Sequence, residues 1–353
     1  MFWINRSRLV LPQVSAPDGG ASPGYSAEAG YELAVVDCAA QPFTELVLSW
    51  NAETPPDTTI RVEARLHVSA VDDQPEAGGW SAWRGLGHWG AASADETPLP
   101  RSGESPAPED PAVEVAVDTL RVAKGYEATA FQARVTLYGG AASPAVYLLA
   151  ASTAHRRQPP VSAEADPPLG RPVALPVPAR SQLVEREEIA HEICSPTSVS
   201  MVLQFYGIDR PTEEVAQGVY DHGAEIYGNW PFNTAYAARH GLQAVVRHFG
   251  TLGEVERELH KGHPVIISVA FEPGELPEAP IARTNGHLIV VTGVDAAGDF
   301  LVNDPAAHPH KGQAISRTYG RENLRRVFLG HGGVGYVLEP LPSIADPREV
   351  VPA

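Results

Sequence analysis

The stretch Glu192-Ile193-Cys194-Ser195-Pro196-Thr197-Ser198 places a cysteine directly before a predicted helix. The helix is expected to run from about Pro196 to Tyr206, because apolar residues recur at helical spacing and Gly207 stands just past the end. A helix N-terminus offers unpaired N–H groups and the positive end of the helix dipole, which together stabilise a thiolate. Cys194 is therefore a candidate nucleophile, although a small buried core residue is the commoner role of an arbitrary cysteine.

Further helices and a set of strands are predicted to follow this motif. The helices are expected to begin at Thr212, as a cap, to span Asn233 to His240, and to run from Leu252 to Gly262. The strands are expected at Pro264 to Phe271, His287 to Val294, Asp299 to Val302 and Val334 to Glu339, with a short helix at Arg321 to Phe328. Helices first and an antiparallel sheet afterwards predict an α+β domain.

The first part of the chain, to about residue 154, is predicted to consist of strands. Thr59 to Ala70 alternates apolar and polar residues, which is typical of a strand with one buried face. Two antiparallel sheets packed face to face, a β-sandwich, are the simplest fold for this series. The segment Ala91 to Pro111 is poor in apolar residues and is expected to be a long surface loop. Further strand candidates are Phe43 to Trp50, Trp80 to Trp89, Phe131 to Tyr138 and Ala145 to Ala151.

A proline-rich segment separates the two parts, and a chain of 353 residues is long enough for two domains. The predicted organisation is a β-sandwich domain at 1–154, a linker at 155–175, an α+β domain at 176–340 and a C-terminal tail at 341–353. Because proline-rich linkers make few contacts, a cut near Pro167 is expected to leave two independently folding pieces.

The composition narrows the classes of function. Acidic residues outnumber basic ones by 43 to 26, and a net charge of −17 without a basic run argues against binding to nucleic acid or anionic membranes. Two cysteines, Cys38 and Cys194, exclude a disulfide scaffold and a thiolate zinc cage, so no cofactor and no metal are expected. No membrane-spanning run and no export signal are found. The sequence as it stands predicts a soluble protein, cytoplasmic if the chain is complete.

A nucleophilic cysteine needs a base within hydrogen-bond reach. His287, at the start of an apolar strand, is the first candidate. His191, three residues before the cysteine, is its rival, although a solvent-facing loop position is the commoner explanation for that histidine. The two remain alternatives at the level of the residues alone.

An acidic or amide side chain would hold the imidazole in one tautomer. Asp295 would lie about 26 Å from the histidine along an extended strand. A hairpin that pairs Val294 with Asp299 instead places Asp304 on the face of the histidine and diagonally adjacent to it. A register slip of one residue would present Asn303 in its place.

Gln182 is a further catalytic candidate, and three other residues are candidates for binding the substrate. Gln182, twelve residues before the cysteine, carries an amide that could join the Cys194 backbone N–H in holding a developing oxyanion. Trp230, beside a proline, is a candidate wall of the substrate groove, and core packing is nearly as common for such a residue. Asn285 and Gly286, directly before the candidate base, are placed in the same groove.

Together these residues carry a resemblance. The sequence resembles the papain-like peptidases that process bacteriocin leaders, which are cysteine-peptidase family thirty-nine and its broader "like" subfamily. The matching residues are Gln182, the run Cys194 to Ser198, Gly286-His287 before an apolar strand, and Asn303-Asp304-Pro305. The resemblance covers about residues 174–340, with Ser195 where the family usually has glycine. It implies that Gln182 is the oxyanion residue, Cys194 the nucleophile, His287 the base and Asp304 its orienting partner.

Other segments resemble a multidomain subset of that family from GC-rich bacteria. They are residues 228–232, 274–276 and 284–287 in the second part and residues 43–46, 49–51 and 117–120 in the first.

The sequence thus predicts a β-sandwich followed by a papain-like cysteine peptidase domain. Cys194 would attack the carbonyl of a peptide or amide, His287 would return the proton to the leaving amine, and water would clear the acyl-enzyme. The alternatives are acyl transfer, in which an amine or thiol replaces that water, and a papain-like module that only binds peptides. The expected partner is a peptide or protein substrate, and a protein or a glycan is the candidate ligand of the first domain.

Overall fold

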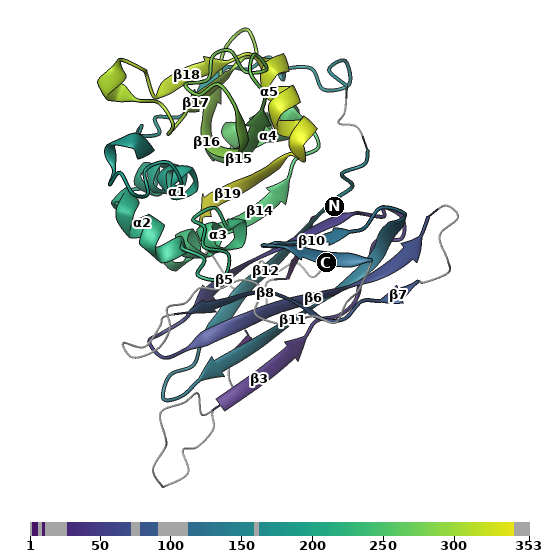
Figure 1. The fold of residues 1–353 in the computed structure, drawn as a ribbon. Helices are drawn as coiled ribbons and strands as arrows, with labels where there is room; N and C mark the ends of the chain where they lie inside the picture. The colour runs from purple at the N-terminus through teal and green to yellow at the C-terminus, as the bar shows by residue number, and fades with distance from the viewer. Residues whose placement is uncertain are drawn as a thin grey trace, which may run out of the picture.

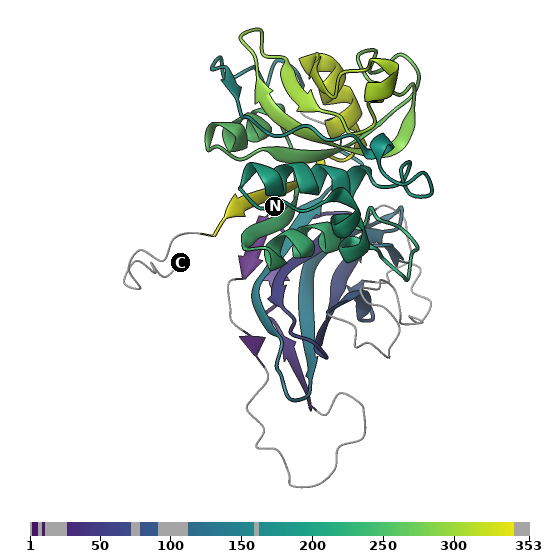
Figure 2. The ribbon, with the colours of Figure 1, turned by 90° about the vertical axis from the view of Figure 1, so that its left-hand side faces the viewer.

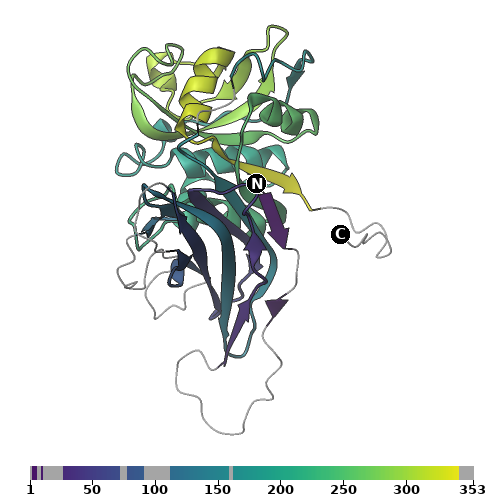
Figure 3. The same cartoon turned by 90° about the vertical axis from the view of Figure 1, so that its right-hand side faces the viewer.

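The computed structural model describes residues 2–5, 9–10, 27–71, 78–90, 112–158 and 162–341. Within these ranges the chain forms a β-rich N-terminal domain and a C-terminal domain that carries all of the described α-helices (Figure 1). Figures 2 and 3 show the C-terminal domain stacked on the N-terminal sheets. The predicted loop Ala91 to Pro111 and the tail beyond Leu341 lie outside the described residues.

The N-terminal strands form two antiparallel sheets. One sheet has the order β1-β12-β5-β10-β9 with β2 beside β12, and the other has the order β3-β11-β6-β7 with β4 beside β11 and β8 beside β6. Their bounds are β1 (Phe2–Asn5), β2 (Leu9–Val10), β3 (Ala27–Glu32), β4 (Val36–Asp37), β5 (Glu45–Glu53), β6 (Thr59–Ala70), β7 (Gly79–Trp80), β8 (Arg84–Gly90), β9 (Val113–Ala116), β10 (Thr119–Val122), β11 (Tyr126–Gly139) and β12 (Ala145–Ala154).

Strands β5, β6, β11 and β12 lie close to the predicted positions, whereas β1 to β4, β9 and β10 were not predicted. The alternating apolar residues of β6, from Ile60 to Val68, are all buried, as the period of two predicts. The predicted strand Trp80 to Trp89 is instead split into β7 and β8. Ser81 causes the break, because its backbone N–H donates to Leu66 O (2.8 Å) and its hydroxyl accepts from Leu66 N (3.0 Å). Pairing with β6 resumes at Arg84.

The C-terminal domain packs its helices against a third sheet of order β14-β19-β15-β16-β17-β18, with β13 beside β16. The helices are α1 (Cys194–Phe205), α2 (Thr212–Val219), α3 (Trp230–Arg239), α4 (Leu252–His260) and α5 (Arg321–Phe328), with 3-10 turns at Gln182–Val184, Pro309–Lys311 and Leu329–His331. The strands are β13 (Val173–Ala174), β14 (Leu242–His248), β15 (Val265–Phe271), β16 (Thr284–Val294), β17 (Phe300–Asn303), β18 (Ser316–Tyr319) and β19 (Val334–Pro340).

Three expectations about this domain are wrong. Strand β14 lies between α3 and α4, so the helices do not all precede the sheet, and neither β14 nor β18 was predicted. Helix α2 has Pro211 at its N-cap, and Thr212 is its first helical residue. Helix α3 begins three residues early, because the Asn229 side chain caps it by accepting a hydrogen bond from Phe232 N (3.1 Å).

Strand β14 is the edge of the third sheet, and its outer side faces the N-terminal domain. On that side, backbone groups of every second residue from Ala244 to His248 form hydrogen bonds with side chains of β5 and β12. These backbone groups are therefore satisfied without pairing to another strand. The pairs are Asn51 with both backbone groups of Ala244 (2.6 and 3.2 Å), Ser49 with Val246 N (3.1 Å) and Ser152 with His248 N (2.8 Å).

A hydrophobic core also crosses this boundary. Phe232 of α3 lies against Trp50 and Trp89 of the N-terminal domain, with ring centroids 6.0 and 5.5 Å apart. All three side chains are buried in one cluster that contains residues of both domains. The two domains therefore share apolar surface that each would expose alone.

The linker is also anchored. Asp166 is buried, and its carboxylate accepts hydrogen bonds from the N–H groups of Leu252 (2.6 Å) and Gly253 (2.9 Å) at the start of α4. Its Oδ2 also pairs with Arg325 at 3.1 Å. The expectation that the linker makes few contacts is wrong. That expectation was the reason for predicting two independently folding pieces, so the prediction loses its basis.

Asn51→Ala is expected to lower the free energy of unfolding by about 1–3 kcal/mol, because it leaves both backbone groups of Ala244 buried without a partner. Urea denaturation of the full chain would measure the change. Gln158→Ala, at an exposed turn, is the matched control and is expected to stay within about 0.5 kcal/mol of the parent. Equal stability of the two variants would contradict the role given to Asn51.

Candidate functional site

Cys194 is the first residue of α1, two residues earlier than the predicted helix start, and its side chain is half-buried. Hydroxyl groups on the same turn fix the start of α1 against two strands. Ser198 Oγ donates to Leu288 O on β16 (3.1 Å), and Ser195 Oγ lies 3.0 Å from Tyr336 OH on β19. Ser195, which stands where the resembled family usually has glycine, thus has a buried hydrogen-bond partner in Tyr336.

His287 and Asp304 meet beside this helix start. His287 Nε2 lies 2.8 Å from Asp304 Oδ1, and both side chains are buried. The other Asp304 oxygen, Oδ2, accepts a hydrogen bond from Tyr319 OH at 2.5 Å. With Nε2 occupied by the carboxylate, Nδ1 is the ring nitrogen left to hydrogen-bond with Cys194. The four side chains form one continuous chain from the sulfur to Tyr319.

The pKa values of the three ionisable groups shift together. Burial raises the pKa of Cys194, but the hydrogen bond and charge of His287 outweigh it, and the pKa of the thiol falls below its ordinary value. Burial lowers the pKa of His287, but Asp304 and Cys194 outweigh it and raise the pKa of the imidazole above its ordinary value. Burial likewise opposes the charge on Asp304, whose pKa the imidazolium nevertheless holds low. These directions favour a thiolate facing an imidazolium.

The hairpin that brings Asp304 to His287 differs from the predicted one. Val294 pairs with Phe300 and not with Asp299, so the predicted turn is wrong. A bulge within Val291–Gly293 then shifts the register by one residue and restores the expected pairing beyond it. Gly293 suits the bulge, because a Cβ there would lie 2.2 Å from Val173 O of β13.

The two alternatives to Asp304 have other partners. Asn303 Nδ2 donates to Val177 O (3.0 Å), and Asn303 Oδ1 accepts from Ser316 Oγ (2.7 Å). Asp295 Oδ1 accepts from the N–H groups of its own turn, at Ala297 and Asp299 (2.8 and 3.0 Å). The structure therefore brings Asp304 to the histidine and leaves the other two in structural roles.

A pocket of about 530 Å³ opens beside Cys194. The three predicted groove residues, Trp230, Asn285 and Gly286, all line it. Trp230 is held from the N-terminal domain, since its backbone N–H donates to Asp118 Oδ2 at 2.7 Å. Burial raises the pKa of that carboxyl to about 6. Two arginines also line the pocket, Arg121 of the N-terminal domain and Arg156, which follows directly after that domain.

The remaining candidates occupy different places. His191 lines the pocket as an exposed side chain, whereas His287 contacts both Cys194 and Asp304. Gln182 is buried, and its Nε2 donates to Ala190 O at 2.8 Å. Gln182 is not among the described residues that line the pocket, so its oxyanion role stays a prediction.

Sequence reasoning missed Tyr319, Asp118 and the two arginines. Tyr319 lies on β18, which was not predicted, and reaches Asp304 because β18 pairs with β17. Asp118 contacts a residue 112 positions away in the sequence. A single sequence carries no periodic signal for a contact of that separation.

Within the described residues, no group of three or more His, Cys, Asp or Glu side chains is placed to hold a metal ion. None of the helices in the same ranges is both long enough and apolar enough to cross a membrane.

Two sequence-family models match the chain. Residues 174–335 match the Peptidase C39-like family, and residues 14–154 match the Peptidase C39 N-terminal domain. No curated protein matches the chain.

Two solved structures resemble part of the chain. One is described as a C39-like peptidase from Bacillus anthracis; it is 18% identical, covers 49% of this chain and 100% of its own, and has a TM-score of 0.37. The other is a double glycine motif protease from an AMS/PCAT transporter in complex with the leader peptide; it is 20% identical, covers 48% of this chain and 98% of its own, and has a TM-score of 0.31.

Proposed function

Residues 174–335 of this chain belong to the Peptidase C39-like family, and from this membership we propose that the protein is a cysteine peptidase that hydrolyses peptide bonds through Cys194, His287 and Asp304. The observation that carries the proposal is the ordered chain of Cys194, His287, Asp304 and Tyr319 at the pocket. A papain-like α+β domain at 176–340 and a β-sandwich at 1–154, joined by the linker at 155–175, belong to the same proposal.

Acylation begins with attack of the Cys194 thiolate on the substrate carbonyl. A carbon–sulfur bond forms and the carbonyl electron pair moves onto oxygen, where N–H groups at the start of α1 would face the developing charge. We assign Gln182 to the same oxyanion. The carbon–nitrogen bond then breaks as the His287 imidazolium gives its proton to the leaving amine.

Deacylation reverses these roles. Neutral His287 takes a proton from water, the resulting hydroxide attacks the thioester carbon, and the thiolate leaves with the carbon–sulfur electron pair. Asp304 stabilises the imidazolium in both steps, and Tyr319 holds Asp304 through its second oxygen.

A diverse peptide library incubated with the intact protein tests the proposal. Mass spectrometry is expected to find new peptide termini that disappear once Cys194 is alkylated. Products that appear only when an amine is added, and carry that amine, would contradict hydrolysis and indicate acyl transfer. A library that stays intact would contradict the proposed activity.

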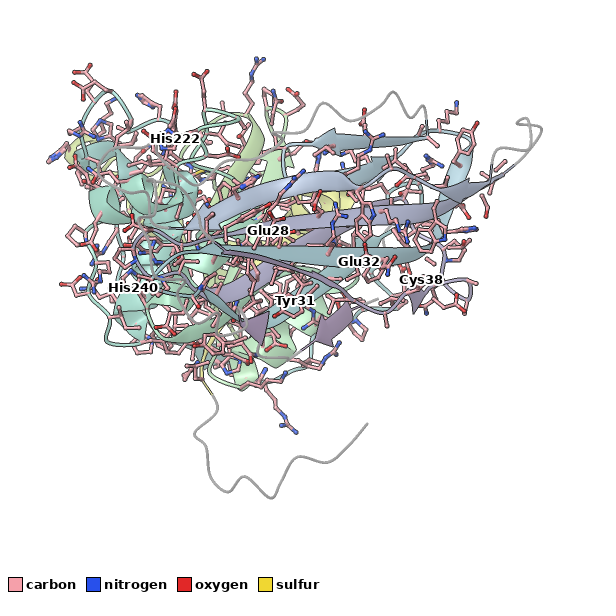
Figure 4. All side chains as sticks on the ribbon, turned by 90° about the horizontal axis from the view of Figure 1, so that it is seen from below. Glu28, Tyr31, Glu32, Cys38, His222 and His240 are labelled. Carbon is pink, nitrogen blue, oxygen red and sulfur yellow. The ribbon has the colours of Figure 1, made fainter. Side chains whose placement is uncertain are left out.

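A limiting dose of iodoacetamide at about pH 6.5 is expected to label Cys194 at least about ten times faster than Cys38. The pKa of Cys38 is raised by burial, and that of Cys194 is lowered by His287, so thiolate persists to lower pH at Cys194. Figure 4 shows Cys38 on the N-terminal domain, on the opposite side of the view from His222 and His240.

Mass spectrometry of tryptic peptides would measure the two rates. His287→Ala is expected to slow labelling of Cys194 and to leave that of Cys38 unchanged. Equal rates at the two cysteines in the parent protein would contradict the ion pair.

A further inference from the structure

The N-terminal domain supplies one wall of the Cys194 pocket. Arg121 on β10 and Arg156, just after β12, line it together with Trp230 and residues 268–270 of β15. Figure 1 shows β10 on the side of the N-terminal domain that faces the C-terminal domain. Cys194 and Arg121 line the same pocket of about 530 Å³, so a substrate bound there can contact both the thiol and this wall.

The two arginines share a single carboxylate. Arg121 Nε lies 3.1 Å from Glu45 Oε1, and Arg156 Nη1 lies 3.7 Å from Glu45 Oε2. Glu45 is buried, whereas the arginine side chains are 45% and 40% exposed. His248 also approaches Glu45, but burial lowers its pKa to about 3, and it adds no charge at neutral pH. Two positive charges therefore face one negative charge here.

The other charged groups near the wall are unevenly distributed. Lys124, Arg157 and Glu114 line the adjoining hollow on the N-terminal domain. Glu192 and Glu225 line the Cys194 pocket from the C-terminal domain. The pocket is thus polarised, positive on the N-terminal side and negative on the other, in a chain whose net charge is −17.

The two arginines do not have the same bonding. Arg156 Nη1 donates to His331 O (3.2 Å), and its guanidinium covers Gly332, where a Cβ would lie 2.5 Å from Nη1. Arg121 donates from Nε to Glu45 Oε1, which orients its guanidinium, and its side chain, 45% exposed, lines the pocket. The planar N–H donors of a guanidinium match the two oxygens of a carboxylate.

We propose that Arg121, together with Arg156, forms a specificity subsite of the Cys194 pocket that binds a carboxylate of the peptide substrate near the scissile bond. The inference rests on the proposed peptidase function for its biological meaning. The carboxylate is either an acidic side chain or the C-terminus of the substrate, and the two sources differ in the experiment below.

Alkylating peptide analogues test the subsite without requiring turnover. Bromoacetyl-Glu-amide is compared with bromoacetyl-Gln-amide for a side-chain carboxylate, and bromoacetyl-Gly with bromoacetyl-Gly-amide for a C-terminal one. In the parent protein, the rate of Cys194 alkylation is expected to be about ten times higher for the acid of at least one pair, as one charge-assisted contact would give. The pair that shows the preference identifies the source.

Arg121→Gln is expected to abolish that preference while leaving the rate with iodoacetamide unchanged. Arg171→Gln, which removes an exposed arginine of the linker, is the matched control and is expected to keep the preference. A preference that survives Arg121→Gln, or that is missing for both pairs in the parent, would overturn the subsite.

Comparing the analogue preference with peptide cleavage in the parent protein separates the subsite from the proposed function. If the preference is found but no peptide is cleaved, the peptidase proposal fails and the carboxylate subsite stands. If peptides are cleaved with equal efficiency whether they carry Glu or Gln, and both analogue pairs react equally, the subsite fails and the peptidase stands.

Discussion

Replacing Cys194 by alanine is expected to lower kcat/KM for peptide hydrolysis by about 10⁴-fold or more, because the variant loses the nucleophile that forms the acyl intermediate. His287→Ala is expected to cost about as much, since the thiol loses the group that ionises it and the leaving amine loses its proton donor. The double variant is expected to be no worse than either single one, because the two residues act as a unit.

Initial rates with one cleaved peptide measure these losses, and the peptide's dissociation constant is expected to change little in Cys194→Ala. Cys38→Ala is the matched control, and it is expected to retain activity because Cys38 lies outside the pocket. Losses that multiply in the double variant would contradict a shared thiolate–imidazolium pair.

Asp304→Ala is expected to lower kcat by on the order of 10²- to 10⁴-fold, because His287 loses the carboxylate that orients and charges it. Asp295→Ala is expected to change kcat by no more than about twofold, since its bonds lie within its own turn and affect stability alone. Equal losses in the two variants would overturn the assignment of Asp304.

Asp304→Asn removes the negative charge of the Asp304 side chain and nearly keeps its shape, so it distinguishes an electrostatic role from a structural one. The carboxylate of Asp304 raises the pKa of His287, so its removal lowers that pKa, and the imidazolium is lost at a lower pH than in the parent. The alkaline limb of the pH profile of kcat/KM is therefore expected to move toward acid. An alkaline limb that stays in place while activity falls would indicate a structural role only, and thermal unfolding of each variant checks that the fold is kept.

Local patterns indicated Cys194 at a helix start and placed Asp304 near His287, but they left His191 open as the base and Asn303 open as its partner. The helix start follows from apolar spacing, and the histidine and the aspartate are linked by one hairpin. Two deviations cancel within that hairpin: the turn is one residue longer than expected, and the bulge before Gly293 removes the difference. The bulge depends on the approach of β13, a contact between segments more than 100 residues apart, which no hairpin rule contains.

The N-terminal half of the site was not predictable in the same way. Arg121 and Asp118 belong to the small hairpin of β9 and β10, which was not predicted, and nothing in its sequence indicates that it faces a pocket in another domain. Strand β14 was missed for a related reason. It follows a helix-ending glycine, and the backbone groups on its outer side are hydrogen-bonded by the side chains of Asn51, Ser49 and Ser152, which lie far earlier in the chain.

The side chains that cover β14 also carry a consequence for how the protein is made. Asn51, Ser49 and Ser152 leave the ribosome before β14 does, so the surface that receives this edge is synthesised first. A C-terminal fragment produced alone has no such surface. Its β14 presents unbonded N–H groups to any extended chain nearby, and aggregation of that fragment would begin at this strand and not at the thiol pocket.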